Sequence, residues 1–371
     1  MHIAMVGTRG VPASYSGFET CVEELGARLV DRGHRVTVYC RSHHVSYSHP
    51  TYRGMHLVKL PTIPNKYLDT IVHTLLSLLH GLFQPYDVVL MFIAGNSLLS
   101  WIPRLRGQKV ILNVDGLDWK REKWPPLAKA YIRWSEKLAT RFPHVFVTDS
   151  RAVQRYYQDQ YSVSPPYIPY GASVQRRPPG EWLARFDLEP QRYIIFVGRL
   201  VPENCPHHLV EAFDGLETDM RCVIVGDAPY AEDYIRALKA TDDPRVIFTG
   251  YVFGEGYEEL CSSAYAFVEA SGVGGTHPAL LEAMAMDNCV VVNDTPENLE
   301  TIGDAGLSYQ GSLGPPALRA VLAQLIAEPG TVEAYRAKAS TRVQEHYDWE
   351  KVTEQYEAIF CSLVNGGSES P

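Results

Sequence analysis

The chain has no closely spaced pair of cysteines. Its seven cysteines are scattered over 371 residues, are odd in number and form no CxxC motif. A disulfide framework and a cysteine-rich zinc module are therefore disfavoured, and reduced thiols that pack as small core residues fit best. We expect a cytoplasmic protein.

Long hydrophobic runs are also missing. The longest apolar region, residues 71–83, is interrupted by polar residues such as His73 and Ser77 and is too short and too polar to span a bilayer. The first apolar run, residues 3–6, is short and follows no basic segment. It therefore has the character of a buried strand and not of a signal peptide.

Signatures of bound cofactors are absent as well. Gly7 and Gly10 lack the third glycine of a dinucleotide fingerprint, so a dehydrogenase is disfavoured. The spacing of His43, His44 and His49 fits no compact metal site, and their segment is expected to be a loop. The sequence predicts neither a bound dinucleotide nor a resident metal.

Charge is divided unevenly along the chain. Residues 1–180 hold 22 Lys and Arg against 12 Asp and Glu, a net charge of +10, whereas residues 181–371 hold 12 against 31, a net charge of −19. A basic half in an otherwise acidic protein favours attraction to an anionic surface or to a lipid-linked phosphate. We expect no nucleic-acid partner.

The order of apolar segments predicts two α/β domains. In the first half, runs such as HIAMVG, HRVTVYC and KVILNV alternate with helical patterns, including one at residues 97–105. A proline-rich break follows, and a second series runs from YIIFVG to CVVVND. Such alternation is typical of βαβ units, so we expect two Rossmann-like, doubly wound parallel sheets.

The predicted domain boundaries follow from this alternation. The N-terminal domain is residues 1–172, the linker 173–190 and the C-terminal domain 191–348. A last helical pattern at 349–364 follows the second sheet and is expected to return to the first domain, and residues 365–371 form a flexible tail. Ligands of open α/β sheets bind beyond the carboxyl ends of the strands, so functional residues are expected in strand-to-helix loops.

One stretch carries the strongest chemical signal. Residues 272–285, GVGGTHPALLEAMA, follow an apolar run and end in a helical pattern. Gly274 and Gly275 allow a tight turn with exposed amides, and Thr276 is expected to cap the helix that follows. A helix N-terminus of this kind suits a phosphate, while Glu282 can accept hydrogen bonds from sugar hydroxyls. An ordinary loop-to-helix turn is the alternative.

Several spaced motifs resemble a known family. GRLVPEN at residues 198–204, Gly250-Tyr251 and GGTHPALLEAMA look like the donor domain of GT-B retaining glycosyltransferases of the family 4 type. GTRGVPASYSGFET, NVDGLDWKREKW and YIPYGA are similar to a narrower branch associated with rhamnosyl transfer in bacterial cell-surface polysaccharide assembly. The resemblance covers nearly the whole chain and implies two sheets that face each other across a cleft.

This resemblance also implies substrates and site residues. The C-terminal domain would hold a nucleotide-diphosphate sugar, the N-terminal domain a saccharide or lipid-linked acceptor, and no metal or other cofactor would be obligatory. Arg199 matches the family's arginine for the diphosphate, a role that suits a planar guanidinium. The implied donor-binding residues are Gly10, Gly198, Arg199, Asn204, Tyr251, Val252, Gly274, Gly275, Thr276, His277 and Glu282. The acceptor candidates are Tyr15, Gly17, Glu19 and Trp119, and the catalytic candidates are Arg199, Asp115 and Asp118.

The sequence departs from the family's pattern in one loop of each domain. The first glutamate of the family's glutamate pair is Gly274 here, and the lysine that commonly follows the arginine is Asn204. The loop where relatives often carry a sugar-contacting histidine has Asp115 and Asp118 instead. These differences predict a branch with its own way of holding the sugar, and an inactive copy is the alternative.

The expected chemistry is glycosyl transfer. Negative charge builds on the departing phosphate, so fixed donors such as Arg199 and the glycine-loop amides help most. The resemblance implies retention, with the leaving phosphate taking the acceptor proton, whereas Asp115 or Asp118 as a general base would suit inversion. A nucleotide-sugar epimerase or phosphorylase of the same fold, and a non-catalytic nucleotide-sugar binding protein, remain the alternatives.

A basic surface with tryptophans is a separate feature. The run at residues 120–124, with Trp101, Arg104 and Arg106, suits contact with an anionic membrane surface or a lipid diphosphate. An ordinary amphipathic surface explains the same residues equally well. The first interpretation predicts peripheral binding to the inner face of the membrane.

Overall fold

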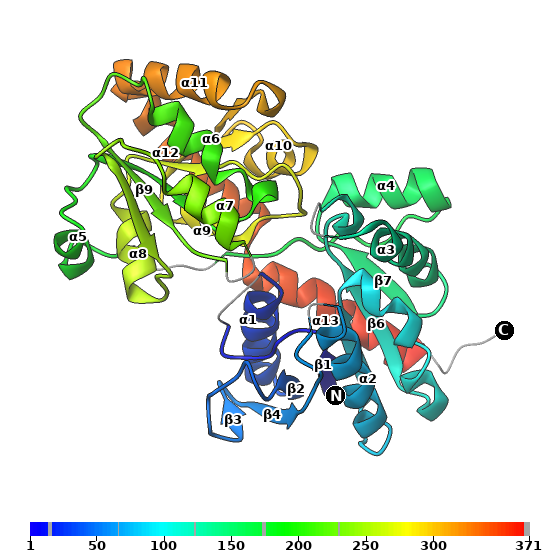
Figure 1. Ribbon diagram of the computed structural model, residues 1–371. Coiled ribbons are helices and arrows are strands. Elements are labelled where there is room, and N and C mark those ends of the chain that lie inside the picture. The colour runs from blue at the N-terminus through cyan, green and yellow to red at the C-terminus, as the bar shows by residue number, and fades with distance from the viewer. Residues whose placement is uncertain (14–16, 66, 122–123, 173–175, 229–230, 367–371) are drawn as a thin grey trace. The chain divides into compact units, whose positions relative to one another are not determined.

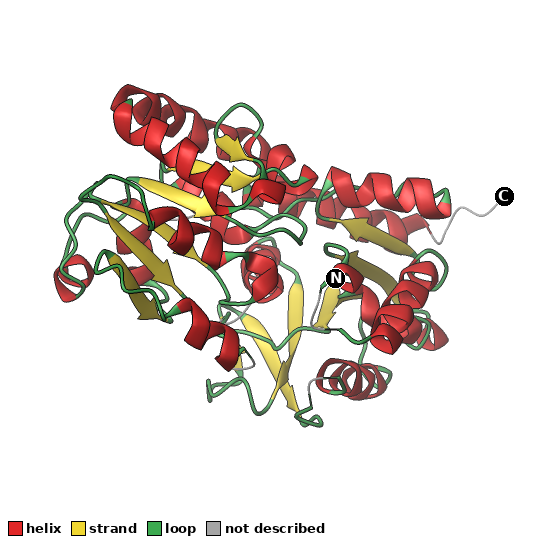
Figure 2. Cartoon of the chain, turned by 45° about the horizontal axis from the view of Figure 1, so that its top comes forward, coloured by secondary structure: helices red, strands yellow, loops and turns green. Residues whose placement is uncertain are grey.

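The computed structural model describes residues 1–13, 17–65, 67–121, 124–172, 176–228 and 231–366. The chain forms two units (Figure 1). Unit 1 is Met1–Tyr170 with Trp349–Pro371, and unit 2 is Gly171–Asp348. Each unit contains one β-sheet flanked by helices, as the colouring by secondary structure shows in Figure 2.

Unit 1 is built on a seven-stranded sheet in the order β3-β4-β2-β1-β5-β6-β7. Only β3 and β4 pair in antiparallel fashion, and the other neighbours are parallel. All five residues of β5 are buried, which is expected for a parallel strand covered on both faces. The strands are β1 (His2–Val6), β2 (Arg35–Arg41), β3 (Thr51–Tyr52), β4 (Met55–Leu60), β5 (Val88–Phe92), β6 (Lys109–Val114) and β7 (Val145–Thr148).

Unit 2 has a six-stranded, wholly parallel sheet in the order β10-β9-β8-β11-β12-β13. Its strands are β8 (Tyr193–Val197), β9 (Arg221–Val225), β10 (Val246–Gly250), β11 (Ala266–Glu269), β12 (Cys289–Asn293) and β13 (Leu307–Tyr309). The first strand, β8, lies between β9 and β11, so the strand order reverses beside it. Unit 1 has the same order once the short β3 is set aside.

This shared strand order confirms the predicted α/β class with two doubly wound sheets. The reversal next to β1 and next to β8 is the topological switch point at which such sheets bind ligands. In unit 2 the loops that flank this point follow β8 and β11. These loops carry GRLVPEN and GVGGTHP, so the fold brings the two motifs to one edge of the sheet.

The helices of unit 1 differ from the expected pattern at one place. Residues 97–105, predicted as a helix, instead contain parts of two 3-10 segments, η1 (Ala94–Leu99) and η2 (Pro103–Arg106). Pro103 has no amide proton to donate, so the first segment cannot continue through it. The other elements are α1 (Gly17–Asp31), α2 (Asp69–Gly81), η3 (Asp118–Lys120), α3 (Pro126–Ala139), α4 (Arg151–Tyr161) and α13 (Trp349–Asn365).

The C-terminal helix α13 belongs to unit 1, where it packs against α1. Tyr356 and Phe360 are almost wholly buried on this helix. Its acidic face meets basic residues of α1: Arg32 pairs with Glu350 at 2.8 Å and with Glu357 at 2.9 Å. Apolar burial and these ion pairs together fix the last helix on the first unit.

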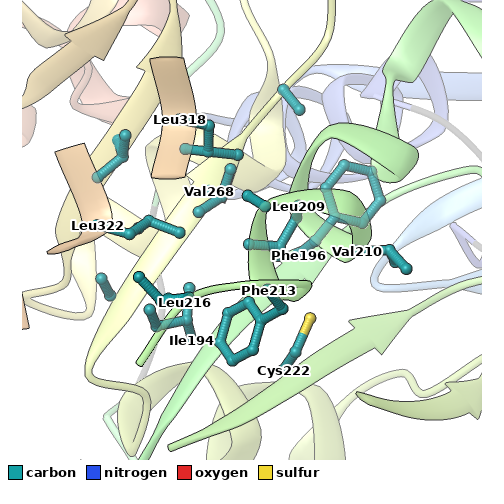
Figure 3. Close-up of a cluster of buried hydrophobic side chains, with 14 of the residues drawn as sticks. Ile194, Phe196, Leu209, Val210, Phe213, Leu216, Cys222, Val268, Leu318 and Leu322 are labelled. Atoms are coloured by element: carbon teal, nitrogen blue, oxygen red, sulfur yellow. The ribbon is translucent and has the colours of Figure 1, made fainter. Parts of the chain in front are cut away.

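Helices cover the unit 2 sheet more extensively than the sequence predicted. Residues 181–185, placed in the linker, form α5 (Glu181–Arg185), and three helices that the sequence analysis did not specify follow β12. α6 and α11 pack on one face of the sheet through Leu209, Phe213, Leu318 and Leu322 (Figure 3). The remaining elements are η4 (Pro202–Asn204), α6 (Pro206–Phe213), α7 (Glu232–Leu238), α8 (Glu255–Ser262), α9 (Pro278–Ala285), α10 (Pro296–Ile302), η5 (Gly311–Leu313), α11 (Pro315–Ala327) and α12 (Pro329–His346).

Candidate functional site

The loop after β8 holds Arg199 through its backbone. The carbonyl of Arg199 accepts the Val201 amide at 2.9 Å and the side-chain amide of Asn204 at 3.0 Å. Asn204 is buried, so its side chain stiffens the loop from within. The backbone of Gly198 packs closely against Gly226, because a Cβ on Gly226 would lie 1.9 Å from the Gly198 carbonyl oxygen. The loop thus presents the half-buried Arg199 from a fixed backbone.

The loop after β11 is tied to the loop after β8. The Gly272 amide donates to the Glu203 carbonyl at 3.0 Å, which joins the two motifs directly. Asn293 donates to the Ala270 carbonyl at 2.9 Å and Asn298 to the Ser271 carbonyl at 3.3 Å. The sequence analysis missed both asparagines, because only the fold places them beneath this loop.

The amides of Gly274 and Gly275 lie at the tip of the glycine loop. No residue in the described part of the chain accepts a hydrogen bond from the amides of Gly274 and Gly275. Helix α9 begins at Pro278, and its N-cap is His277, whose side chain makes no capping bond. The prediction that Thr276 caps the helix is therefore wrong. Proline favours the first helical position, which moves the cap one residue onward, and Thr276 is buried instead.

Gly274 and His277 share one space. A Cβ built on Gly274 would lie 2.5 Å from Cε1 and 2.6 Å from Nε2 of His277. The imidazole therefore occupies the volume where a side chain of residue 274 would begin. This contact gives a physical reason for glycine at the position where the family pattern has glutamate.

Glu282 lies on α9 and meets a tyrosine of α8. The Tyr257 hydroxyl donates to Oε2 of Glu282 at 2.7 Å. Burial, together with the charge of Glu282, raises the pKa of Tyr257 well above its usual value of 10, so the tyrosine stays a donor. Glu282 therefore sits in a fixed orientation. Tyr257 has no sequence signature that could have revealed this role.

Two exposed aromatic residues follow β10. The rings of Tyr251 and Phe253 are stacked, with centroids 5.6 Å apart and planes inclined by 16°. Their side chains are 45% and 57% exposed, whereas Val252 between them is buried. An exposed pair of aromatic faces can stack on a flat ligand. The sequence analysis identified Tyr251 but missed Phe253.

In unit 1 the loop after β1 is closed by carboxylates. Glu19 accepts the Arg9 amide at 2.9 Å, and Glu23 accepts the Ala13 amide at 2.8 Å. Glu19 is a candidate for binding the acceptor saccharide. Its side chain is buried, and its carboxylate holds the loop. Contact of Glu19 with an acceptor stays a prediction.

The glycines of the same loop have structural roles. Gly10 has a φ of 108°, and a Cβ on it would lie 2.5 Å from the Cys40 sulfur. Packing against β2 therefore already requires glycine there, and approach of a ligand to Gly10 stays a prediction. Gly17 is the first residue of α1. Tyr15, another acceptor candidate, lies outside the described residues.

Asp115 and Asp118, the two aspartates predicted as catalytic candidates, have hydrogen-bond or ion-pair partners nearby in the sequence. Asp115 accepts the Gly116 amide at 2.7 Å, and Asp118 pairs with Arg121 at 2.7 Å. Trp119 beside them lies under the Arg133 guanidinium, 3.9 Å from the ring centroid. These contacts give both carboxylates partners of their own within the loop.

A carboxyl group that the sequence analysis missed lies near Trp119. Glu136 of α3 is buried and accepts the Tyr156 hydroxyl at 2.9 Å, and the Tyr156 ring lies 6.5 Å from that of Trp119. Burial raises the pKa of Glu136 to about 7. This carboxyl group therefore titrates near neutral pH.

Among the residues that the structure describes, two groups of side chains could hold a metal ion. His43 and His44 gather around Asp69, without His49, but Asp69 also pairs with Arg41 at 2.7 Å. The second group is Cys205, His207 and His208 at the start of α6. The sequence analysis did not consider this group.

Two family models match the chain. Residues 191–328 match the family described as "Glycosyl transferases group 1", and residues 1–173 match a domain of unknown function, DUF1972. O-antigen chain mannosyltransferase B of Escherichia coli is 27% identical over 179 residues, which are 47% of this chain and 46% of that protein. The chain spans about half the length of the curated relatives that it matches in this way.

Two solved structures resemble the fold over its full length. Sucrose-phosphate synthase from Thermosynechococcus elongatus gives a TM-score of 0.81 at 18% identity, covering 98% of this chain and 99% of that one. Anabaena HepE, in complex with UDP and glucose, gives 0.80 at 16% identity, covering 98% and 100%. At such identities the likeness concerns the fold alone.

The fold is therefore GT-B, and residues 191–328 match a glycosyltransferase family model. Unit 2 carries the group 1 domain, and the match to the domain of unknown function covers residues 1–173 of the chain. None of the described helices combines the length and the apolar character needed to cross a bilayer.

Proposed function

We propose that this protein transfers a sugar from a nucleotide-diphosphate donor to a saccharide acceptor. Unit 2 binds the donor and unit 1 binds the acceptor. The observation that carries the proposal is the joined pair of loops after β8 and β11, which offer Arg199 and the amides of Gly274 and Gly275 at one sheet edge. Cationic and amide donors at a helix N-terminus bind phosphate groups well.

We assign the donor's nucleoside to the loop after β10 and to helix α9. Tyr251 and Phe253 provide exposed aromatic faces for the base, and Glu282 accepts hydrogen bonds from ribose hydroxyls. The complex of the Anabaena relative with UDP and glucose supports a nucleoside diphosphate as the leaving group. The resemblance of the first half to a rhamnosyltransferase branch makes rhamnose the first sugar to test.

The reaction breaks the bond between the sugar's anomeric carbon and the diphosphate oxygen. Arg199 and the two glycine amides stabilise the charge that grows on the diphosphate. The leaving phosphate takes the proton of the acceptor hydroxyl. The hydroxyl oxygen then bonds to the anomeric carbon on the face from which the diphosphate departs. This retaining route needs no metal and no separate base. Inversion would instead use Asp115 or Asp118 as a general base.

The acceptor is proposed to be lipid-linked, and unit 1 to bind the membrane from its inner face. Leu127 and Trp134 lie on the exposed side of α3, with exposed fractions of 83% and 49%. Arg104 of η2 reaches the carbonyl of Phe142, just after the end of α3, at 2.7 Å. Exposed Trp101 and Leu105 flank the exposed Arg104 in the sequence, so apolar and basic residues occur together in this segment, a combination that suits anionic lipid.

Turnover with a panel of nucleotide sugars tests the proposed reaction. Released nucleoside diphosphate is measured with and without a saccharide acceptor, for the wild type and for Arg199→Ala, Glu282→Gln and the distant control Arg236→Ala. Acceptor-dependent release that Arg199→Ala and Glu282→Gln reduce, and that the control retains, supports the assignment. Activity that survives both substitutions contradicts the site.

Other outcomes of the same assay identify the alternatives. An epimerase would change the donor without any acceptor, and a phosphorylase would require inorganic phosphate. A non-catalytic binding protein would show donor-dependent thermal stabilisation and no turnover.

Sedimentation with vesicles tests the membrane contact. Vesicles that contain anionic lipid should bind the protein at low salt and release it at high salt, because salt screens exposed charges. Replacing both Leu127 and Trp134 with serine should reduce binding. Binding that is independent of salt argues against the basic surface.

A further inference from the structure

Three metal-ligating side chains gather at the start of α6, outside the residues assigned to the donor. Cys205, His207 and His208 each offer one ligand atom, and the three atoms lie within 4.8 Å of one another. Cys205 is the N-cap of α6 and has a left-handed φ of 50°. A non-glycine residue is unfavourable in this region, so the surrounding structure must hold it there. None of the seven cysteines forms a disulfide, so the Cys205 sulfur can act as a ligand.

Two tyrosines orient the two imidazoles. Nδ1 of His207 lies 2.7 Å from the Tyr234 hydroxyl of α7, and Nδ1 of His208 lies 2.9 Å from the Tyr309 hydroxyl of β13. Imidazoles that bind metals are usually held in this way, by a polar partner on the second ring nitrogen. Nε2, the other nitrogen of each ring, is then the atom that would bind an ion. Elements that are distant in sequence thus converge on this short segment.

We propose that Cys205, His207 and His208 bind one divalent metal ion of the zinc type. A thiolate with two imidazoles is a ligand set that Zn²⁺ prefers, and three protein ligands leave a fourth position for water. Binding converts the thiol to a thiolate and releases its proton to solvent. The group around Asp69 is less suitable as a metal site, because the Asp69 carboxylate already forms an ion pair with the Arg41 guanidinium.

The ion would fix the end of the loop that carries Arg199. Glu203, two residues before Cys205, accepts the Gly272 amide at 3.0 Å, so an ion on Cys205 also stabilises the junction with the glycine loop. The ion takes no part in the bond exchange. This role rests on the proposed function, whereas binding of the ion does not.

Cobalt substitution tests the site, because Co²⁺ reports its ligands by absorption. The wild-type protein titrated with Co²⁺ should show the visible bands of a tetrahedral site and a thiolate-to-cobalt charge-transfer band in the near ultraviolet. Cys205→Ser should lose the charge-transfer band. Cys361→Ser, a matched change at a partly exposed thiol of α13, should retain the full spectrum. Far-ultraviolet circular dichroism of each variant controls for folding.

The tyrosines provide a milder variant that leaves all three ligands in place. Tyr309→Phe should weaken Co²⁺ affinity by about 10–100-fold, as loss of an outer partner does in other sites. A wild-type protein without a thiolate charge-transfer band overturns the proposal, and so does a Cys205→Ser variant that keeps the band. Both measurements are made without donor or acceptor, so their failure is distinct from failure of the glycosyltransferase assay.

Discussion

The loops at the switch points of the two units have equivalent positions in the fold but differ in how their amides are bonded. β1 is followed by Gly7 and soon by Arg9, and β8 is followed by Gly198 and Arg199. In unit 1 the carboxylates of Glu19 and Glu23 accept the loop amides. These two amides therefore have acceptors within unit 1.

The corresponding edge of unit 2 also contains a buried carboxylate, because Glu269 accepts the Ser271 amide at 3.0 Å at the base of the glycine loop. Asn293, Asn298 and the Glu203 carbonyl hold the same part of the loop. The amides of Gly274 and Gly275 have no acceptor among the described residues. The difference teaches that the described amides of Arg9 and Ala13 are bonded internally, whereas the amides at the tip of the glycine loop are the ones that we propose for a phosphate.

The largest effect that would test this comparison is expected from the two arginines. Arg199→Ala should lower kcat by about 10²–10³-fold, because a fixed donor to the growing charge is lost. Arg9→Ala, in the loop after β1 of unit 1, should leave kcat within about threefold, because its side chain is assigned no donor contact and a substitution away from the site typically alters free energies by no more than ~0.5 kcal/mol. Steady-state rates with a saturating donor measure both.

An equal loss in the two arginine variants would break the comparison. It would mean that the loop after β1 also contacts the diphosphate. Thermal denaturation of both proteins shows whether a loss reflects unfolding instead.

A second prediction concerns the buried Glu136 of unit 1. Burial raises its pKa from 4.5 to about 7, so the folded chain binds more protons than the unfolded chain between these values. Stability should therefore decrease as the pH rises through this window, by at most about 3 kcal/mol. Glu136→Gln should flatten the decrease and raise stability above pH 7, measured by urea denaturation at several pH values. A pH dependence unchanged in Glu136→Gln would contradict the assignment.

The sequence revealed the architecture better than the geometry of the site. Alternating apolar runs were sufficient to predict both sheets, because parallel strands buried on two faces are continuous hydrophobic segments. The glycine loop and Arg199 were recognisable as motifs. The partners of those motifs were not: Tyr257, Asn293 and Asn298 reach them only through strand order, which no local pattern encodes.

The cap of α9 illustrates the limit of local rules. Thr276 is a good capping residue, yet Pro278 determines where the helix begins and makes His277 the cap. The same histidine fills the space beside Gly274. The glycine at position 274 thus depends on the histidine three residues away. This dependence cannot be judged from either residue alone.

A third prediction tests whether the carboxylate of Glu19 closes the loop of unit 1. Glu19→Ala removes the acceptor of the Arg9 amide and should destabilise the protein by about 1–3 kcal/mol. Glu19→Gln retains an acceptor oxygen and serves as the matched control, with a smaller loss. Donor affinity measured by titration should be unchanged in both. Weaker donor binding in Glu19→Gln, without loss of stability, would assign this residue to the ligand instead.

The smallest expected effect sharpens the comparison at the glycine loop itself. Gly274→Ala places a Cβ against the His277 ring, so the ring must move and the adjacent amides shift with it. Affinity for the nucleoside diphosphate selected by a thermal-shift panel should fall by about threefold to tenfold, or roughly 1 kcal/mol. Combined with His277→Ala, the same change should cost less, because the space is then vacant. This non-additivity in a double-mutant cycle is the expected sign of direct contact. Strictly additive losses would show that the imidazole does not set the conformation of the loop, and that the glycine at 274 serves the ligand directly.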